Sequence, residues 1–235
     1  YLYLGTDNGI LVYNYRTDKY EQPDTDFPTD VRTMVLQGDT LWIGSLNGLY
    51  TYQLKSRQLN HFDSKQTGLP HNTIYSIIHT KDNQIYIGTY NGLCRYVQAS
   101  GKFENILLPV NRGGSNLFVN SLLEDTTQQC IWIGMEGYLF QYNPTTGEMK
   151  AIEVFHNNSI KSLALDGDEN LLAGTDNGLY VYQNDKEPLQ HIIHDSRNIQ
   201  SLTNNIIWNI FSDQEHNIWL GTDYGISLSR YNSAL

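Results

Sequence analysis

Eight polar and aromatic residues have the chemistry expected of a binding site. Aromatic rings can stack on sugar rings, and arginine and asparagine side chains offer hydrogen bonds to hydroxyl or carboxylate groups. These residues stand in loops or tight turns, where binding residues concentrate on a rigid scaffold. The sequence therefore predicts a ligand site that draws on His71, Tyr90, Arg112, Asn116, Glu136, Arg197, Trp208 and Tyr224.

Metal and catalytic chemistry are not encoded in a recognisable pattern. His191 and His194 are three apart on a predicted strand, so their side chains point to opposite faces. Residues 166–170 resemble the start of a calcium loop but lack the glycine and terminal glutamate of an EF-hand. We expect no catalytic residue, no metal and no cofactor. A carboxylate pair for glycoside cleavage stays open, because such pairs are assembled in space.

A sequence repeat positions the candidate residues. Each copy is an apolar run, a Gly-Thr-Asx-x-Gly type of turn, and a second run of alternating residues, which predicts a β-hairpin whose turn glycine supplies positive φ. The copies recur at about 43 residues, a period typical of repeat architectures. The hairpin motifs begin at Leu2, Leu41, Ile85, Ile131, Leu171 and Ile218.

Two further strands accompany most hairpins. A more polar segment follows the hairpin and predicts an outer strand. An apolar segment precedes five of the hairpins, and these segments begin at Val31, Ile74, Val119, Ile160 and Ile206. Four antiparallel strands per repeat match one blade of a β-propeller, in which neighbouring blades bury both faces of each sheet.

The predicted fold class is thus all-β: a β-propeller of four-stranded antiparallel blades with six repeat units. Residues 1–235 are expected to form a single propeller domain or a propeller fragment. The first unit lacks its innermost strand and the last lacks its outermost strand, which leaves 22 strands. A closed ring needs more, so we expect part of a seven-bladed or tandem propeller.

Repeated turn and core positions are predicted to be structural. Asx side chains of the hairpin turns are expected to bond nearby backbone, at Asp7, Asn47, Asn91, Asp176 and Asp223. The tryptophans of the apolar runs are expected in the core, at Trp42, Trp132 and Trp219.

One end of each predicted blade carries the variable loops. If the upstream strand is innermost, each hairpin turn lies at the same end as the loops that enter the inner strands. These loops are long and differ between units, whereas the turns at the other end are short. We therefore expect ligand binding at the end with the long loops.

Composition excludes several partners. There are 15 basic and 25 acidic residues, a net charge of -10, and no Lys/Arg cluster, which argues against nucleic acid and against direct contact with a membrane. The two cysteines exclude a disulfide scaffold. Spacing alone does not decide whether Cys94 and Cys130 are bridged, but the reduced, buried state is favoured.

The hairpin signature resembles the two-component regulator propeller repeat. The pattern is hydrophobic-Trp-Ile-Gly-Thr-Asx-x-Gly-Leu-x-x-Tyr, with an upstream Leu-Pro-x-Asn-Thr at residues 69–73, and it recurs over essentially the whole chain. Departures occur at residues 135–138 and 172–173. In this family the repeats build periplasmic sensor regions of hybrid histidine kinase/response regulators in glycan-degrading bacteria, as two seven-bladed propellers in tandem.

The resemblance implies a periplasmic sensor, the extracytoplasmic part of an inner-membrane protein. It would detect oligosaccharides from glycan breakdown and relay the signal to a histidine kinase outside this segment, which itself would not be an enzyme. Expected partners are an oligosaccharide and the rest of the sensor kinase chain, and a homodimer is left open. Two alternatives also remain: a protein-interaction scaffold without a small ligand, and a carbohydrate-active propeller enzyme.

Overall fold

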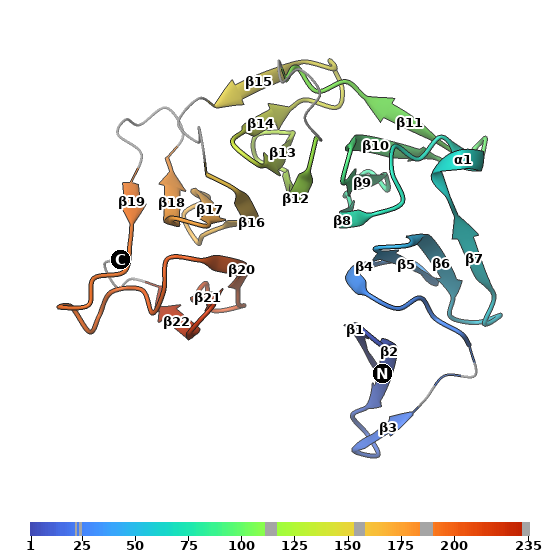
Figure 1. Ribbon diagram of the computed structural model, residues 1–235, viewed down its shortest axis with the longest axis horizontal. Helices are drawn as coiled ribbons and strands as arrows, with labels where there is room; N and C mark the ends of the chain where they lie inside the picture. Colours follow the sequence, from blue (N-terminus) through green and yellow to red (C-terminus); the bar gives the residue numbers. More distant parts are fainter. Residues whose placement is uncertain (22, 24, 111–116, 153–157, 184–189, 232–235) are drawn as a thin grey trace. The chain divides into compact units, whose positions relative to one another are not determined.

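The computed structural model describes residues 1–21, 23, 25–110, 117–152, 158–183 and 190–231. These residues form 22 strands and one short helix, in six sheets of three or four strands (Figure 1). The chain divides into two compact units, Tyr1–Val119 and Asn120–Leu235. Whether residues 1–235 form a single domain stays a prediction.

The first unit contains three sheets. The first has three strands, β1 (Leu2–Thr6), β2 (Gly9–Asn14) and β3 (Lys19–Glu21). The second has four, β4 (Val31–Gln37), β5 (Thr40–Ser45), β6 (Gly48–Gln53) and β7 (Leu59–Phe62). The third has β8 (Ile74–His79), β9 (Ile85–Thr89), β10 (Gly92–Val97) and β11 (Lys102–Ile106).

The remaining strands form three more sheets. The fourth sheet has β12 (Val119–Asp125), β13 (Cys130–Met135), β14 (Leu139–Tyr142) and β15 (Met149–Ile152). The fifth has β16 (Ile160–Leu165), β17 (Leu171–Thr175), β18 (Gly178–Tyr182) and β19 (Gln190–Ile192). The sixth has three strands, β20 (Ile207–Ser212), β21 (Ile218–Thr222) and β22 (Gly225–Ser229).

Each sheet is a propeller blade. Strands pair antiparallel in chain order, and the first strands of successive sheets pack together, β4 on β8 in the first unit and β16 on β20 in the second. The prediction of an all-β propeller built from six repeat units is confirmed. The described residues also contain the expected 22 strands, with three in the first sheet and three in the last.

The long loop after β7 contains a helical turn that the sequence pattern did not predict. Helix α1 (Ser64–Thr67) begins after Asp63, whose carboxylate accepts hydrogen bonds from the backbone of Lys65 and Gln66. It ends at Gly68, which has a φ of 83°. This is the Asp cap and left-handed glycine that begin and end a helix.

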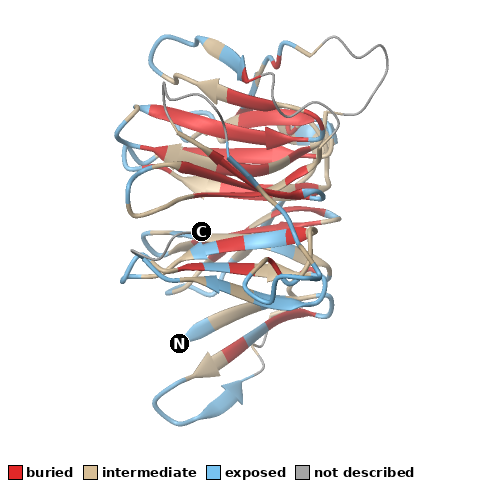
Figure 2. Cartoon of the chain, turned by 90° about the vertical axis from the view of Figure 1, so that its left-hand side faces the viewer, coloured by how far each residue is buried: buried red, intermediate tan, exposed pale blue. Residues whose placement is uncertain are grey.

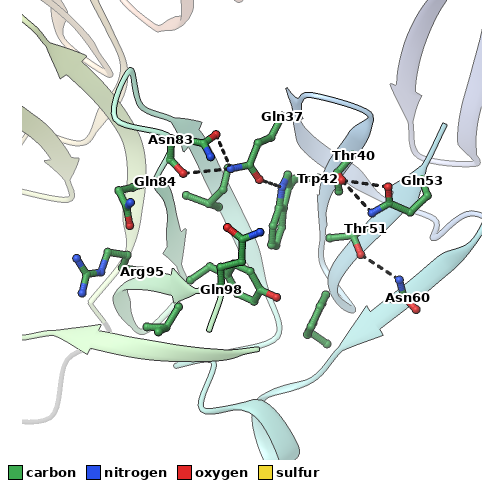
Figure 3. A pocket seen from close by; sticks show the side chains of 14 residues that line it. Gln37, Thr40, Trp42, Thr51, Gln53, Asn60, Asn83, Gln84, Arg95 and Gln98 are labelled. Atoms are coloured by element: carbon green, nitrogen blue, oxygen red, sulfur yellow. Dashed lines mark hydrogen bonds between the residues drawn. The ribbon is translucent and has the colours of Figure 1, made fainter. Parts of the chain in front are cut away.

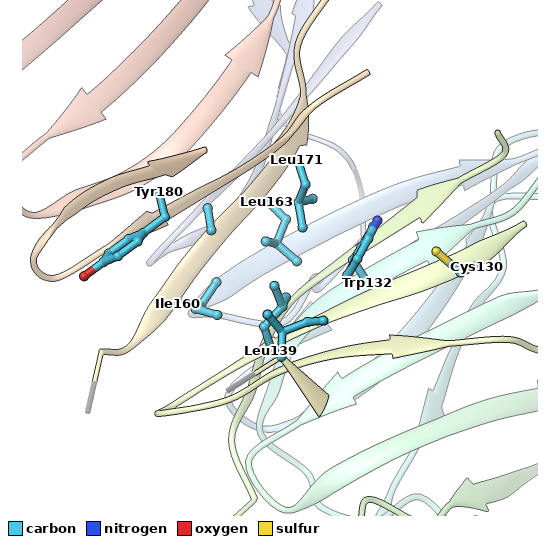
Figure 4. Close-up of a cluster of buried hydrophobic side chains, with 9 residues drawn as sticks. Cys130, Trp132, Leu139, Ile160, Leu163, Leu171 and Tyr180 are labelled. Carbon is cyan, nitrogen blue, oxygen red and sulfur yellow. The ribbon is translucent and has the colours of Figure 1, made fainter. Parts of the chain in front are cut away.

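Burial is greatest in the second strand of each central sheet. Strands β9, β13 and β17 are buried at every residue (Figure 2). The last strand of each four-stranded sheet, by contrast, is mostly exposed or half-buried. A sheet covered on both faces has continuous apolar strands instead of alternating ones. Figure 4 shows one such core in the second unit, where Trp132 and Leu139 pack with Ile160 and Leu163.

Two of the three predicted core tryptophans are buried. Trp42 is 3% exposed and Trp132 is fully buried, but Trp219 is 39% exposed, so the prediction for Trp219 is wrong. Trp219 pairs across the sixth sheet with Phe211 and Leu228, and all three side chains are exposed. The sequence pattern does not reveal this, because it reports the periodicity of a strand and not what covers its face.

The first glycine of the first five repeats has a packing role, whereas Gly221 in the sixth has room for a Cβ atom. A Cβ atom on Gly44 would lie 2.6 Å from Ile74 Cγ2, and one on Gly174 would lie 2.7 Å from Ile207 Cγ2. In both cases the contact comes from the inner strand of the next blade. A glycine here lets that strand approach closely.

Hydroxyl groups, and not the Asx side chains, hold the hairpin turns. Thr89 Oγ1 donates to the Gly92 carbonyl at 2.9 Å and accepts from Asn91 N at 3.1 Å. The same bond to the turn glycine recurs at Thr6, Ser45, Thr175 and Thr222. It takes the place of the Asx bonding that the sequence predicted at Asp7, Asn47, Asn91 and Asp223, whereas Asp176 does accept a backbone N–H, from Ser159.

Candidate ligand-binding face

Hairpin turns and inner-strand entries meet at one end of the sheets, as predicted. In the first unit, Gly92 N donates to the Leu117 carbonyl at 2.9 Å. In the second unit, Gly178 N donates to the Asn205 carbonyl at 2.7 Å. Each bond ties a hairpin turn to the segment that enters the next inner strand. We name this end of the sheets the loop face.

A β-bulge occurs at the start of four inner strands, β4, β8, β16 and β20. In each case the pairing register shifts between the first and third residues of the strand or its ladder. A bulge leaves one residue unpaired and re-aims its side chain, and bulges are common beside binding sites. The residues inside the four bulges are Arg32, Tyr75, Lys161 and Trp208.

The second residue of each hairpin turn is the other variable position. In five of the six turns a Ser or Thr hydroxyl before it holds the turn, so this side chain can change from blade to blade. In the fourth turn Met135 stands at that position instead. The residues there are Asp7, Leu46, Tyr90, Glu136, Asp176 and Asp223. The loop face therefore displays variable side chains at the hairpin turns and at the four bulges.

In the first unit these positions build an aromatic cluster. The ring of Tyr90 lies 4.9 Å from that of His71 and 4.2 Å from that of Phe118, in an edge arrangement with the latter. Phe118 is in turn 6.2 Å from Tyr75. Burial raises the pKa of Tyr75, and the positive charge of Arg32 opposes that rise.

Two predicted site residues, His71 and Tyr90, are thus brought together. Both are half-buried, and their loops are tied by the bond from Tyr90 N to the Thr73 carbonyl at 2.9 Å. His71 Nδ1 accepts from Thr73 N at 3.0 Å, which leaves its Nε2 for a further partner.

In the second unit the same positions join a cation, an indole and a carboxylate. Trp208 is 56% exposed, and Lys161 Nζ lies 4.3 Å from the centre of its ring. Trp208 Nε1 donates to Asp223 Oδ1 at 2.5 Å. Asp176 Oδ1 likewise accepts from Ser159 N at the entry to β16. The two aspartates therefore connect hairpin turns to inner strands.

The other predicted residues have no common partner within the described chain. Tyr224 follows Asp223 and is 81% exposed. Glu136 is exposed and forms a backbone bridge with Ser159. Arg197 is exposed and pairs with Asp195 in its own loop at 3.2 Å. Hydrogen bonds from the backbone and guanidinium of Arg197 lower the pKa of Asp195.

Arg112 and Asn116 lie outside the described residues. They stay predictions.

Sequence analysis missed Arg32, Tyr75, Lys161 and Phe118. A signal for the first three was present, since each follows the first apolar residue of an inner strand in Val-Arg-Thr, Ile-Tyr-Ser and Ile-Lys-Ser. Aligning the repeats would have shown one variable position between two similar ones. Phe118 has no such signal, because its contact with Tyr90 depends on loop conformation.

The histidines considered for a metal pair have other partners. His191 stacks on Tyr180 at 4.1 Å, with its Nε2 2.6 Å from the Asn177 carbonyl oxygen. His194 Nδ1 lies 2.5 Å from the Leu202 carbonyl oxygen. Asp166 accepts three bonds from its own turn. In the described residues, no three His, Cys, Asp or Glu side chains form a group that could hold a metal ion.

Cys94 and Cys130 are both buried and free, in agreement with the reduced state that we expected. Burial raises the pKa of the Cys94 thiol strongly and that of Cys130 to about 11. Among the described residues, no helix is long and apolar enough to span a membrane.

The six sheets are thus the blades of a propeller built from sequence repeats, with variable side chains at one end. The family model for the two component regulator propeller matches residues 68–91 and 201–224. These two segments therefore match the two-component regulator propeller repeat.

Similar proteins agree with this family. The chain is 81% identical to the extracellular domain of BT4673 from B. thetaiotaomicron, described as a hybrid two component system, with a TM-score of 0.97. The match covers the whole of this chain and 32% of that domain. Histidine kinase P4 of Formosa agariphila is 27% identical over 195 residues, which are 77% of this chain and 14% of the kinase.

A more distant structure shows the fold alone. The extracellular domain of BT3049 from B. thetaiotaomicron, also described as a hybrid two component system, has 22% identity and a TM-score of 0.78. The match covers 96% of this chain and 31% of that domain. The chain thus spans about a third of each of these two solved domains.

Proposed function

We propose that this chain is the ligand-sensing part of a hybrid two-component signalling protein. It lies outside the cytoplasmic membrane, in the periplasm, and relays ligand binding to a histidine kinase elsewhere in the same protein. The extracellular relatives support this location, and the kinase relative supports the signalling role. The chain itself binds and does not catalyse.

The proposed ligand is an oligosaccharide released by glycan breakdown, bound at the loop face. The observation that carries this proposal is the set of bulged residues at the inner strands. The half-exposed ring of Trp208 offers a plane for stacking, and Lys161 and Asp223 stand beside it as hydrogen-bonding groups. In the first unit, Tyr75 and Arg32 offer the same pairing of aromatic ring and cation.

Calorimetry against a panel of plant and microbial oligosaccharides tests the proposal. Trp208→Ala should weaken binding of the best ligand about fivefold or more, because an aromatic contact of this kind contributes about 1–3 kcal/mol. Tyr15→Ala is the matched control, since Tyr15 is 62% exposed and lies at the opposite end of its sheet. It should bind the ligand as the unaltered chain does.

Two results would contradict the proposal. No heat with any glycan, together with a stable complex with another protein, would favour the interaction scaffold. Turnover of a polysaccharide by purified chain would show an enzyme.

A further inference from the structure

A cavity opens between the second and third sheets of the first unit, at the end opposite the loop face (Figure 3). Its volume is about 410 Å³, within the range of about 300–1,000 Å³ that small-molecule sites occupy. It is lined by the last residues of β4 and β6, the first residues of β5, and the turn between β8 and β9. The loop-face residues take no part in it.

The lining is polar but uncharged. Among the lining residues only Arg95 carries a charge, and Glu104 Oε2 neutralises it at 2.7 Å. Six primary amides supply most of the polar groups: Gln37, Gln53, Asn60, Asn83, Gln84 and Gln98. Such a lining has no charge with which to attract an ion, but it offers paired donors and acceptors.

Several of the amides are held in place by one another. Gln37 accepts from Trp42 Nε1 at 3.0 Å and donates to Asn83 Oδ1 at 3.0 Å. Gln53 pairs with Thr40 at 2.9 Å. These bonds orient the polar groups before a ligand arrives, which lowers the entropy cost of binding.

Other amide groups stay available. Within the described part of the chain, the structure shows no hydrogen-bond partner for the side chain of Gln98. Gln84 makes only a long contact, 3.4 Å from its Nε2 to the Asp82 carbonyl. Each can still offer both a donor and an acceptor to a ligand.

Aromatic rings form the apolar wall. Tyr96 meets Trp42 edge-on at 4.8 Å and Phe62 at 6.1 Å. Trp42 and Phe62 stack at 6.2 Å. Such a wall suits a ring that has C–H groups on its faces and hydroxyl groups on its edge.

Cavities also lie between other blades, but their linings differ from this one, in which six amides stand beside an aromatic wall. In the same unit, the cavity between the first and second sheets is lined by four leucines together with Glu21 and Arg57. In the second unit, the cavity between the fifth and sixth sheets has three amides, Asn170, Gln183 and Gln190, but it also has the carboxylates of Asp166 and Asp168. The amide lining is therefore a property of these particular residues and not of the fold.

We propose that this cavity is a binding site for one neutral sugar residue. The amides bond its hydroxyl groups, and the rings of Tyr96 and Phe62 cover its C–H face. The site is separate from the loop face and does not depend on the proposed sensing function. It gives the chain a second carbohydrate contact at the other end of the blades.

Titration of the ¹⁵N-labelled chain with glucose, galactose, mannose, xylose and arabinose tests the proposal. At least one of these sugars should shift the Trp42 indole N–H signal and the side-chain amide signals of the cavity. The indole signal of Trp208 reports binding at the loop face in the same spectra. Absence of binding in the cavity and absence of binding at the loop face can therefore be distinguished.

Variants place the binding in the cavity. Gln98→Leu, at an exposed position that leaves the fold intact, should weaken binding several-fold, and the double variant Gln53→Leu, Gln98→Leu about tenfold or more. Asn105→Leu, an exposed amide on β11 outside the cavity, is the matched control and should bind normally. Trp208→Ala should leave sugar binding in the cavity, as reported by the Trp42 signal, unchanged.

The proposal is overturned if none of the five sugars shifts the Trp42 signal. It is equally overturned if Gln98→Leu and the double variant bind as tightly as the unaltered chain, or if binding is lost in Trp208→Ala. That last result would place the sugar at the loop face.

Discussion

Arg32, Tyr75, Lys161 and Trp208 differ in chemistry but occupy one structural position. Each lies inside a bulge that opens an inner strand, and apolar residues that pack in the core precede it. The neighbouring residues keep the blade together, so the side chain between them can change without altering the fold. Variation between the repeats is therefore concentrated at the loop face, where we propose that the ligand binds.

A glycine lies next to last in the first strand of each hairpin, and in the first five sheets it is expected to be sensitive to an added methyl group. Gly44→Ala should destabilise the chain by about 1–3 kcal/mol, because the new Cβ would overlap Ile74 and Thr33. Urea unfolding measures the change.

Gly221→Ala is the matched control for Gly44→Ala. Its Cβ would find its nearest neighbour at 3.8 Å, so this variant should be neutral or slightly more stable. Equal destabilisation of both variants would show that the close contact is not the cause.

The two thiols are expected to be unreactive in the folded chain. The thiolate is the reactive form, and burial raises the pKa of Cys94 and Cys130 well above that of a free thiol. At pH 8, a disulfide reagent such as dithiobisnitrobenzoate should modify neither cysteine in native protein. After unfolding in guanidinium it should modify both. Fast modification of the native chain would contradict the buried state.

At the scale of elements, the same arrangement closes two of the short turns at the end opposite the loop face. An aspartate ends an inner strand and accepts backbone N–H groups from its own turn, as Asp125 and Asp213 do. Each also accepts the indole N–H of the tryptophan in the next strand, at 3.1 Å for Trp132 and 2.9 Å for Trp219. Turn and hairpin are thereby joined through one carboxylate.

This arrangement should make stability depend on acid pH. The Trp219 indole bond, with amide bonds from the turn, lowers the pKa of Asp213 below its usual 3.8. Its contribution is therefore fully present above that usual value and is lost as the pH falls through the lower, folded pKa. Urea midpoints from pH 6 down to pH 2 measure it.

Asp213→Asn removes this titrating group. The variant should be less stable than the unaltered chain at pH 6, and the difference should shrink as the solution is acidified. Parallel curves for the two proteins over the whole range would show that Asp213 does not contribute in this way.

At the scale of the whole molecule, acidic charge and exposed apolar rows act against each other. The net charge is -10 at pH 7, which keeps copies apart. The sixth sheet nevertheless exposes a row of Phe211, Trp219 and Leu228. An exposed row of large apolar side chains favours association once repulsion is removed.

The chain is therefore expected to associate near its pI of about 5.0. Sedimentation velocity at pH 7 and pH 5 measures this. The double variant Phe211→Ser, Leu228→Ser should reduce association at pH 5. Leu107→Ser, which alters an apolar side chain that is 90% exposed but outside the row, should not. Equal association of both variants would exclude the row as the cause.

The sequence by itself determined the repeat, the strand order and the end of the blades where variable loops gather. These follow from local periodicity and from turn glycines, which act over a few residues. It also selected His71, Tyr90 and Trp208, because aromatic residues in loops stand out from the repeat.

Only the tertiary structure decided what the side chains contact. The bulges that re-aim Arg32 and Lys161, the exposure of Trp219, and the amide cavity all depend on contacts between blades or on what covers a face. Gln37 and Asn83, for example, are 46 residues apart in the chain and hydrogen-bonded in the fold. Periodicity predicts that a strand forms, but it contains no information on which side chain from the next blade will lie against it.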